Sequence, residues 1–521
     1  MISNILWVDD EIDSLKSQIL FLKNKGYEIT PFTNGYDVLE YLRTHKAEVV
    51  LLDESMPGIT GLETLTQIKA LYPSIPVIMV TKNEEENIME EAIGSQITDY
   101  LIKPVNPNQV LLSLKRVFDG KRLVSEKTNT EYQKDFRNLF MTLNSNPNLE
   151  EWKELYRKLV YWEIEMSKKS DSAEMLEVFN TQKFEANNEF YKFVSKNYLD
   201  WINRTTKDLP VFSHQLFAEK IAPFIQKGKP SFMILIDNLR YDQWKSIEPI
   251  LSEQFSVQHE DTFFSILPTA TQYSRNAIFA GMMPLDIEKK FPEYWKNDEE
   301  EGGKNLYEKE LLEAQLKRLK LDDLKWDYVK ITNNNDGKSL EDNIHNYLKN
   351  DLTVIVYNFV DMLSHARTEM EVLRELAGDE VSYRSLTVSW FEHSPLYGAL
   401  KKIADKDIQL FVTTDHGTTR VKTPSKCIGD KSTSTNLRYK HGRNIQYDPR
   451  EVFDVTNPNK AGLPQPNVNS KYIFAKGDVF LCYPNNYNHF VNYYKNTFQH
   501  GGISLEEMII PIVRLKSKQS I

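Results

Sequence analysis

Aspartate and histidine side chains stand at the ends of three apolar segments within residues 211–521 of this 521-residue chain. The segments, each ending in an aspartate, are residues 231–237, 353–361 and 408–415. Such runs are typical of buried parallel strands, whose carboxyl ends meet at one edge of a sheet. The third segment continues from Asp415 into His416, and a carboxylate oxygen beside an imidazole nitrogen suits zinc. Taken alone, this pair is more often only a polar turn after a strand.

Further residues extend this candidate metal site. His365 follows Asp361 by four positions, so a helical turn starting there would point both side chains at one spot. His500 precedes two glycines, which let the backbone approach a site closely. The collected donors are too many for one tetrahedral zinc and suit two adjacent metal ions. They are Asp237, Asp361, His365, Asp415, His416 and His500.

A threonine at the start of a predicted helix is the candidate nucleophile. Residues 267–271 read Leu-Pro-Thr-Ala-Thr and lead into residues 272–279, which we interpret as the start of an amphipathic helix. Beside zinc, the Thr271 hydroxyl can lose its proton and attack phosphorus, while the amides of the helix N-terminus hold a phosphate. The simpler alternative is that Thr271 only caps the helix.

A second group of acids lies in the first 120 residues. Asp9-Asp10, Asp53, Thr81 and Lys103 each close a different predicted strand. Three carboxylates at one sheet edge repel one another unless a cation lies among them, and hard oxygen donors suit Mg²⁺. Asp53 can then accept a phosphoryl group whose oxygens are neutralised by Lys103 and hydrogen-bonded by Thr81. The alternative is a flavodoxin-like domain whose acids are merely solvated strand ends.

An α/β framework is needed to position these residues, and the sequence divides into three parts. Residues 1–120 alternate five short apolar strands with helical segments, which predicts a doubly wound, flavodoxin-like parallel sheet. Residues 121–210 have apolar side chains at helical spacing, which predicts a connector bundle of three or four helices. Residues 211–521 return to strands and predict a second α/β domain, which carries the zinc candidates.

Composition and charge narrow the possible functions. The net charge is −10 and the connector shows no helix-turn-helix pattern, so we expect no direct binding of duplex DNA. The two cysteines, Cys427 and Cys482, form no CxxC motif, which argues against disulfides and thiolate metal sites. The sequence has no basic N-terminal signal and no run of about 20 apolar residues. We therefore expect a cytoplasmic protein without a membrane span.

The N-terminal part resembles the receiver domain of two-component response regulators in its motifs Asp9-Asp10, Asp53-Glu54-Ser55-Met56-Pro57-Gly58, Thr81 and Lys103-Pro104. The resemblance implies that a sensor histidine kinase phosphorylates Asp53, and that Asp9, Asp10 and Asp53 hold Mg²⁺. It also implies a switch between Thr81 and Tyr100, which reshapes the last helical faces and commonly drives phosphorylation-dependent dimerisation.

The C-terminal part resembles the alkaline phosphatase superfamily, specifically its PglZ-type branch, in the order of its candidate ligands. The spacing from Thr271 to Gly281-Met-Met-Pro284 is also similar to that of nucleotide pyrophosphatase/phosphodiesterase relatives. The resemblance implies two zinc ions and Thr271 as nucleophile. One ion would be held by Asp361, His365 and His500, and the other by Asp237, Thr271, Asp415 and His416.

The order of receiver, helical connector and PglZ domain resembles that of PorX-type regulators, which are associated with type IX secretion in Bacteroidetes. It implies phosphodiesterase activity on short linear or cyclic oligonucleotides, and a link to an alternative sigma factor. A non-catalytic alternative stays open, in which the PglZ domain serves mainly to bind a sigma factor or a secretion-complex protein. The presence of the active-site residues does not separate the two, because presence does not prove turnover.

Substrate contacts are assigned from charge alone. We interpret residues 440–443, Lys-His-Gly-Arg, as a flexible basic loop whose Lys440 and His441 bind substrate phosphates, although a plain solvated loop explains them equally well. Asn238 and Arg240 are further candidates because they follow Asp237 directly. Residues 333–337, Asn-Asn-Asn-Asp-Gly, are predicted to be a solvated loop.

Overall fold

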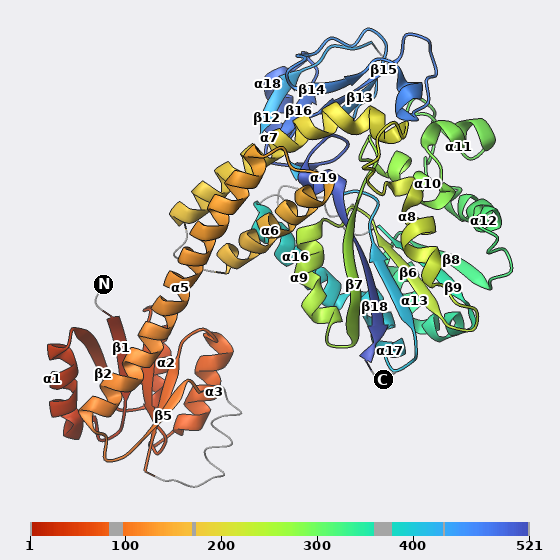
Figure 1. The fold of residues 1–521 in the computed structure, drawn as a ribbon. Helices are drawn as coiled ribbons and strands as arrows, with labels where there is room; N and C mark the ends of the chain where they lie inside the picture. The colour runs from red at the N-terminus through yellow and green to blue at the C-terminus, as the bar shows by residue number, and fades with distance from the viewer. Residues whose placement is uncertain (1–2, 83–96, 169–172, 359–377, 431–432, 519–521) are drawn as a thin grey trace. The chain divides into compact units, whose positions relative to one another are not determined.

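The computed structural model describes residues 3–82, 97–168, 173–358, 378–430 and 433–518 (Figure 1). The chain forms two compact units, Met1–Arg137 and Asn138–Ile521, and each is considered by itself. None of the described helices is long and apolar enough to cross a membrane.

The first unit is built on a five-stranded parallel sheet with the order β2-β1-β3-β4-β5. Successive apolar residues of the three central strands, β1, β3 and β4, enter separate cores on the two faces of the sheet, because strand side chains alternate in direction. The doubly wound prediction is confirmed. The strands are β1 (Ser3–Val8), β2 (Tyr27–Phe32), β3 (Val49–Asp53), β4 (Val77–Thr81) and β5 (Asp99–Ile102). The helices are η1 (Ile12–Leu15), α1 (Lys16–Asn24), α2 (Gly35–Leu42), α3 (Gly61–Leu71) and α5 (Pro107–Asn144).

Long helices make up the connector. The predicted border at residue 120 falls inside α5, which ends at Asn144. Asn148 caps α6 (Leu149–Ser167) and exchanges hydrogen bonds with Glu151 in a capping box. Helix α7 (Ala173–Ile202) packs on α6, with the Trp152 and Phe190 ring centroids 5.3 Å apart.

The second unit is organised around a six-stranded mixed sheet with the order β7-β18-β10-β6-β9-β8. The parallel strands are β6 (Ser231–Ile236), β8 (Trp326–Ile331), β9 (Leu352–Tyr357) and β10 (Gln409–Thr413), whereas β18 (Ile509–Ser517) runs antiparallel to β10 and to β7 (Phe255–Phe264). Figure 1 shows α9 (Tyr241–Leu251) and α16 (Glu380–His393) on one side of this sheet, with α10 (Thr271–Ala280) and α12 (Glu308–Arg318) on the other.

Smaller elements complete the second unit. Its shorter strands form two two-stranded ladders and one three-stranded sheet. They are β11 (Thr419–Arg420) with β17 (Phe498–Gln499), β12 (Thr423–Lys426) with β16 (Val479–Cys482), and β13 (Tyr439–Gly442), β15 (Lys471–Ala475) and β14 (Val452–Val455). The remaining helices are α8 (Ser213–Leu216), η2 (Phe217–Ile221), η3 (Ala222–Phe224), α11 (Pro284–Lys290), α13 (Asn334–Asn343), η4 (Ile344–Lys349), α17 (Pro395–Ile403), η5 (Pro458–Ala461), α18 (Tyr487–Tyr494) and α19 (Leu505–Met508).

Four local predictions are corrected by the structure. The strand expected over residues 353–361 ends at Tyr357, and residues 359–377 lie outside the described chain. Helix α10 is buried on all sides rather than amphipathic, because it packs against both α8 and α12. Residues 333–337 begin α13, since the Asn333 side chain accepts hydrogen bonds from two backbone N–H groups. Residues 439–442 form β13 rather than a flexible loop.

Candidate metal and phosphorylation sites

A buried cluster of carboxylate and imidazole groups lies at the carboxyl edge of the large sheet. Asp237 follows β6, and Asp415 with His416 follows the adjacent parallel strand β10. One ligand atom from each residue lies within 4.8 Å of the other two, and all three residues are buried. Parallel strands that end side by side therefore bring residues from distant parts of the sequence together, as the apolar pattern predicted.

The Thr271 hydroxyl lies against this cluster. Its Oγ1 atom is 3.0 Å from His416 Nε2 and 3.5 Å from Asp237 Oδ1. Thr271 is the first residue of α10, and the N-cap position is Ala270, so Thr271 does not cap the helix. His416 Nδ1 lies 3.2 Å from the Gly417 carbonyl oxygen; a proton on Nδ1 would leave Nε2 as an acceptor facing Thr271.

Two carboxylates, an imidazole and a hydroxyl converge here, and this donor set fits a tetrahedral zinc ion. Asp415 Oδ1 is oriented by the backbone N–H groups of Asn238, at 3.2 Å, and of His416, at 3.1 Å. The Asp415 carboxylate is thus held by backbone N–H groups of the two loops that meet at this edge.

Arg275 belongs to the same cluster, although charge and spacing in the sequence had not indicated it. Its guanidinium pairs with both carboxylates, with Nε 2.9 Å from Asp415 Oδ2 and NH2 in contact with Asp237. NH1 donates to Asn358 Oδ1 at 3.1 Å. Burial acts to raise the pKa of Asp415, but the Arg275 charge holds that pKa below its ordinary value. The available signal was position: Arg275 lies one helical turn after Thr271.

His500 also lies against this cluster. Its ring stacks on the His416 ring, with centroids 4.2 Å apart, and its Nδ1 atom is 3.1 Å from the Thr269 carbonyl oxygen. The structure therefore places His500 beside the zinc candidates. Asp361 and His365, the other predicted ligands of the second ion, lie outside the described residues.

The acids of the first unit also converge. Ligand atoms of Asp9, Asp10 and Asp53 lie within 4.8 Å of one another, a set of hard oxygens that fits Mg²⁺. Lys103 Nζ is 2.8 Å from Asp9 Oδ2 and 2.9 Å from Asp53 Oδ1. Burial raises the pKa of Asp53 to about 6, although its hydrogen bond from Lys103 acts in the opposite direction.

The predicted switch residues occupy strand ends of the same sheet. Thr81 closes β4, and its hydroxyl donates to a Glu54 carboxylate oxygen. Tyr100 lies on β5 with 42% of its residue surface exposed. The structure thus presents Tyr100 toward solvent while Thr81 is buried.

The residues proposed for substrate contact are mostly enclosed. Lys440 is fully buried on β13, with Nζ 4.3 Å from the centroid of the Tyr483 ring, and burial lowers its pKa to about 8. His441 stacks on Tyr472 at 4.2 Å, and burial lowers its pKa to about 4. Arg240 is also fully buried and is paired with carboxylates. The expectation of a flexible basic loop is therefore wrong.

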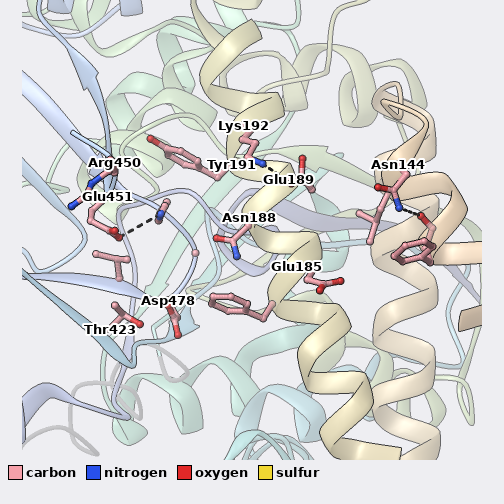
Figure 2. Close-up of a pocket in the computed structure, with 16 residues that line it drawn as sticks. Asn144, Glu185, Asn188, Glu189, Tyr191, Lys192, Thr423, Arg450, Glu451 and Asp478 are labelled. Atoms are coloured by element: carbon pink, nitrogen blue, oxygen red, sulfur yellow. Dashed lines mark hydrogen bonds and ion pairs between the residues drawn. The ribbon is translucent and has the colours of Figure 1, made fainter. Parts of the chain in front are cut away.

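A cavity of about 690 Å³ lies elsewhere in the second unit (Figure 2). Its walls come from the end of α5, from α7 and from the turns that carry Arg450 and Asp478. Figure 2 shows acidic, basic and amide side chains around it, among them Glu185, Asn188 and Arg450. None of the predicted metal or nucleophile residues within the described chain lines this cavity.

Family models match successive parts of the chain. The model for the response regulator receiver domain matches residues 5–115, and the one for the PorX response regulator linker domain matches residues 122–202. The model for the BREX system PglZ alkaline phosphatase-like domain matches residues 216–515. The last match covers more than half of the chain and includes every zinc candidate.

Individual relatives match the N-terminal part. The transcriptional regulatory protein ZraR of Klebsiella oxytoca is 37% identical over 128 residues, which are 25% of this chain and 29% of that protein. The regulatory protein VanRc of Enterococcus gallinarum is 28% identical over 168 residues, 32% of this chain and 71% of that protein. A CheY-like receiver domain from Methanospirillum hungatei JF-1 aligns with a TM-score of 0.23 and 27% identity, covering 23% of this chain and 98% of that structure.

Proposed function

Because this chain belongs to the PorX-type response regulators, in which a receiver domain, a PorX linker and a PglZ domain share one chain, we propose that it is a phosphorylation-controlled, zinc-dependent phosphodiesterase. The alkaline-phosphatase-like domain gives the chain the potential of a phosphoesterase. One observation carries the finer proposal: the Thr271 hydroxyl lies within 3.5 Å of both His416 and Asp237 in a buried cluster.

Thr271 is the group that reacts. Zinc bound to Asp237, Asp415, His416 and Thr271 would supply a Lewis acid that favours the deprotonated hydroxyl. The Thr271 oxygen forms a bond to phosphorus while the bond to the leaving alcohol breaks, which leaves a phosphorylated threonine. A water molecule then attacks the same phosphorus and releases Thr271. Two in-line displacements retain the configuration at phosphorus.

Arg275 and the helix that carries it orient this reaction. The guanidinium fixes the positions of Asp237 and Asp415, because it contacts one oxygen of each. The N-terminus of α10, where Thr271 lies, presents backbone N–H groups and a partial positive charge to a phosphate. The second zinc ion of the proposal is assigned to Asp361, His365 and His500.

The receiver domain regulates the proposed phosphodiesterase activity. A receiver domain implies a cognate sensor histidine kinase, and the Asp53 carboxylate beside Lys103 is the phosphate acceptor in the proposal. Phosphorylation with bound Mg²⁺ would shift the receiver toward a second conformation and toward a homodimer. The further expectations are oligonucleotide substrates, linear or cyclic, and a role in type IX secretion.

A hydrolysis screen tests the proposal. The full chain is loaded with Zn²⁺ and assayed on phosphomonoesters, phosphodiesters, cyclic dinucleotides and short oligonucleotides. We expect diester hydrolysis that is lost after chelation, restored by Zn²⁺ and abolished in Thr271→Ala. Thr332→Ala, at an exposed threonine, is the control and should retain full activity. Diester hydrolysis that survives in Thr271→Ala would rule out the nucleophile.

A second candidate is a non-catalytic regulator that binds a sigma factor or a secretion-complex protein. It is favoured by one observation: Arg275 balances the charges of Asp237 and Asp415, so the cluster is compatible with a folded domain that lacks metal. Signalling output separates the two candidates. If Asp53→Ala removes the output and Thr271→Ala leaves it intact, binding rather than hydrolysis is the function.

A further inference from the structure

A buried network of charged side chains joins the linker helices to the loops of the metal cluster. Its members come from α6, α7, α9, α16 and α19, together with the turn before α9, and all lie in the second unit. They are Glu163, Lys183, Arg240, Asp242, Glu380, Arg384 and Glu506. The mechanism above uses none of them.

Lys183 is the residue through which α7 enters the network. Its Nζ atom lies 2.8 Å from Glu163 Oε2 and 3.0 Å from Glu506 Oε1. Burial acts to lower the pKa of Lys183, yet these carboxylates hold that pKa above its ordinary value, so the ammonium stays charged. One turn later, Asn187 accepts a hydrogen bond from the Leu505 backbone N–H at 2.8 Å.

Glu163 carries the contact from α6 to the catalytic domain. Its Oε1 atom accepts from Arg384 NH1 at 2.7 Å, and the same NH1 lies 3.2 Å from Asp242 Oδ2. Asp242 in turn accepts from Arg240 Nε at 2.8 Å. Arg240 NH1 lies 2.6 Å from Glu380 Oε2, so the network returns to α16, the helix that also carries Arg384.

The network lies next to the segments that carry Asp237, His416 and His500. Arg240 follows Asp237 by three residues, and its guanidinium lies 5.2 Å from the centroid of the Phe498 ring, two residues before His500. A Cβ atom at Gly417, the residue after His416, would overlap the Glu506 carbonyl oxygen and lie 3.3 Å from Arg240 Cγ.

The segments that carry Asp237, His416 and His500 are each anchored, within three residues, to a side chain of this network. Charges this deeply buried are costly to leave unpaired, so they fix the relative positions of the elements that carry them.

We propose that Lys183 and Glu163 of the linker are positioning residues of the metal site, holding its ligand loops in binding geometry through Glu506 and Arg384. The linker helices are then a structural part of the active site rather than a spacer. The inference rests on the proposed metal-dependent function, and it gives the linker a direct route by which to change metal affinity and turnover.

Lys183 variants of the full-length protein test this inference. Lys183→Met removes the charge, and Lys183→Arg keeps it. Lys192→Met is a matched control on the same helix, because Lys192 forms an exposed pair with Glu189. Co²⁺ titration followed by visible absorption measures metal affinity and ligand geometry without requiring turnover, and diester hydrolysis of the zinc-loaded protein gives kcat and KM separately.

We expect Lys183→Met to weaken Co²⁺ binding at least tenfold, to alter its absorption bands and to lower kcat more than it raises KM. Lys183→Arg should restore most of the affinity, and Lys192→Met should match the wild type. A folded Lys183→Met protein with wild-type Co²⁺ affinity, spectrum and kinetics would overturn the inference. If that variant does not fold, Lys183→Gln is judged by the same criteria. A wild-type protein that binds Co²⁺ but hydrolyses no ester refutes the proposed activity, while the spectroscopic comparison still decides the role of Lys183.

Discussion

Replacing Arg275 should make the stability of the second unit depend on metal. In Arg275→Met, the carboxylates of Asp237 and Asp415 lose the guanidinium that contacts both of them, and all three residues are buried. Removing one partner of a buried charge pair costs about 3–5 kcal/mol. Zinc supplies positive charge to the same carboxylates, and a ligand that binds only the folded state stabilises it by mass action. The loss of folding stability in Arg275→Met should therefore be large without metal and much smaller with it.

The expected loss of stability can be converted into a change in Tm, which calorimetry measures. The second unit, Asn138–Ile521, has roughly 380 residues, which at about 2.1 cal/mol/K per residue gives an unfolding entropy of about 0.8 kcal/mol/K. A loss of about 3–5 kcal/mol then lowers Tm by about 4–6 °C. Differential scanning calorimetry in chelator and in excess Zn²⁺ measures both states.

A matched variant and a contrary outcome complete the design. Arg450→Met removes an arginine whose pairing with Asp448 is exposed, so it should leave Tm unchanged in both buffers. If Arg275→Met and the wild type have the same Tm in chelator, the guanidinium does not balance the charges of the carboxylate cluster. An equal loss in chelator and in zinc would show that its role is packing rather than charge.

Three further predictions concern single residues. Thr271→Ala should still bind zinc through Asp237, Asp415 and His416 but lose diester hydrolysis, as measured by metal analysis beside kinetics; loss of both together would make Thr271 chiefly a ligand. Asp53 has a pKa of about 6 in the folded receiver against 3.8 as its ordinary value, so the folded state binds the proton more tightly and its stability rises as pH falls from about 7 to about 4. In Mg²⁺-free buffer, Asp53→Asn should remove this rise, worth at most about 3 kcal/mol, in urea unfolding at both pH values. The pKa of Lys440 is about 8 in the folded state against 10.5, so the unfolded chain binds its proton more tightly and stability increases from pH 8 to pH 10. Lys440→Met should abolish that increase and stabilise the protein at pH 7 by roughly 3 kcal/mol, whereas a loss of hydrolysis without stabilisation would restore Lys440 as a substrate contact.

The receiver fold and the proximity of Asp237 to Asp415 were predictable because their signals are local and repeated. Apolar runs such as 231–236 form buried parallel strands, and a polar residue directly after a run then has only the sheet edge to occupy. Asp237 and Asp415 therefore lie together although 178 positions separate their numbers, as the strand pattern required.

The predictions that were wrong or incomplete have a common physical cause. The side chains concerned are buried by segments that are distant in the sequence. The segment Lys440-His441 looks polar, but β15 pairs with it and Tyr472 covers His441. Arg275 reads as an ordinary surface arginine of a helix until α8 and α12 enclose α10 on both sides. The residues of a segment do not by themselves show which distant segments will cover it.

The charge network between the linker and the ligand loops has a consequence in the reverse direction. Coupling free energy is reciprocal: if a shift of α6 and α7 changes metal affinity by some factor, metal binding changes the equilibrium of those helices by the same factor. Phosphorylation reaching the linker and zinc arriving from solution would then be two inputs to one equilibrium. Such a protein would respond most strongly when both are present, and the supply of metal would set the size of the response to phosphorylation.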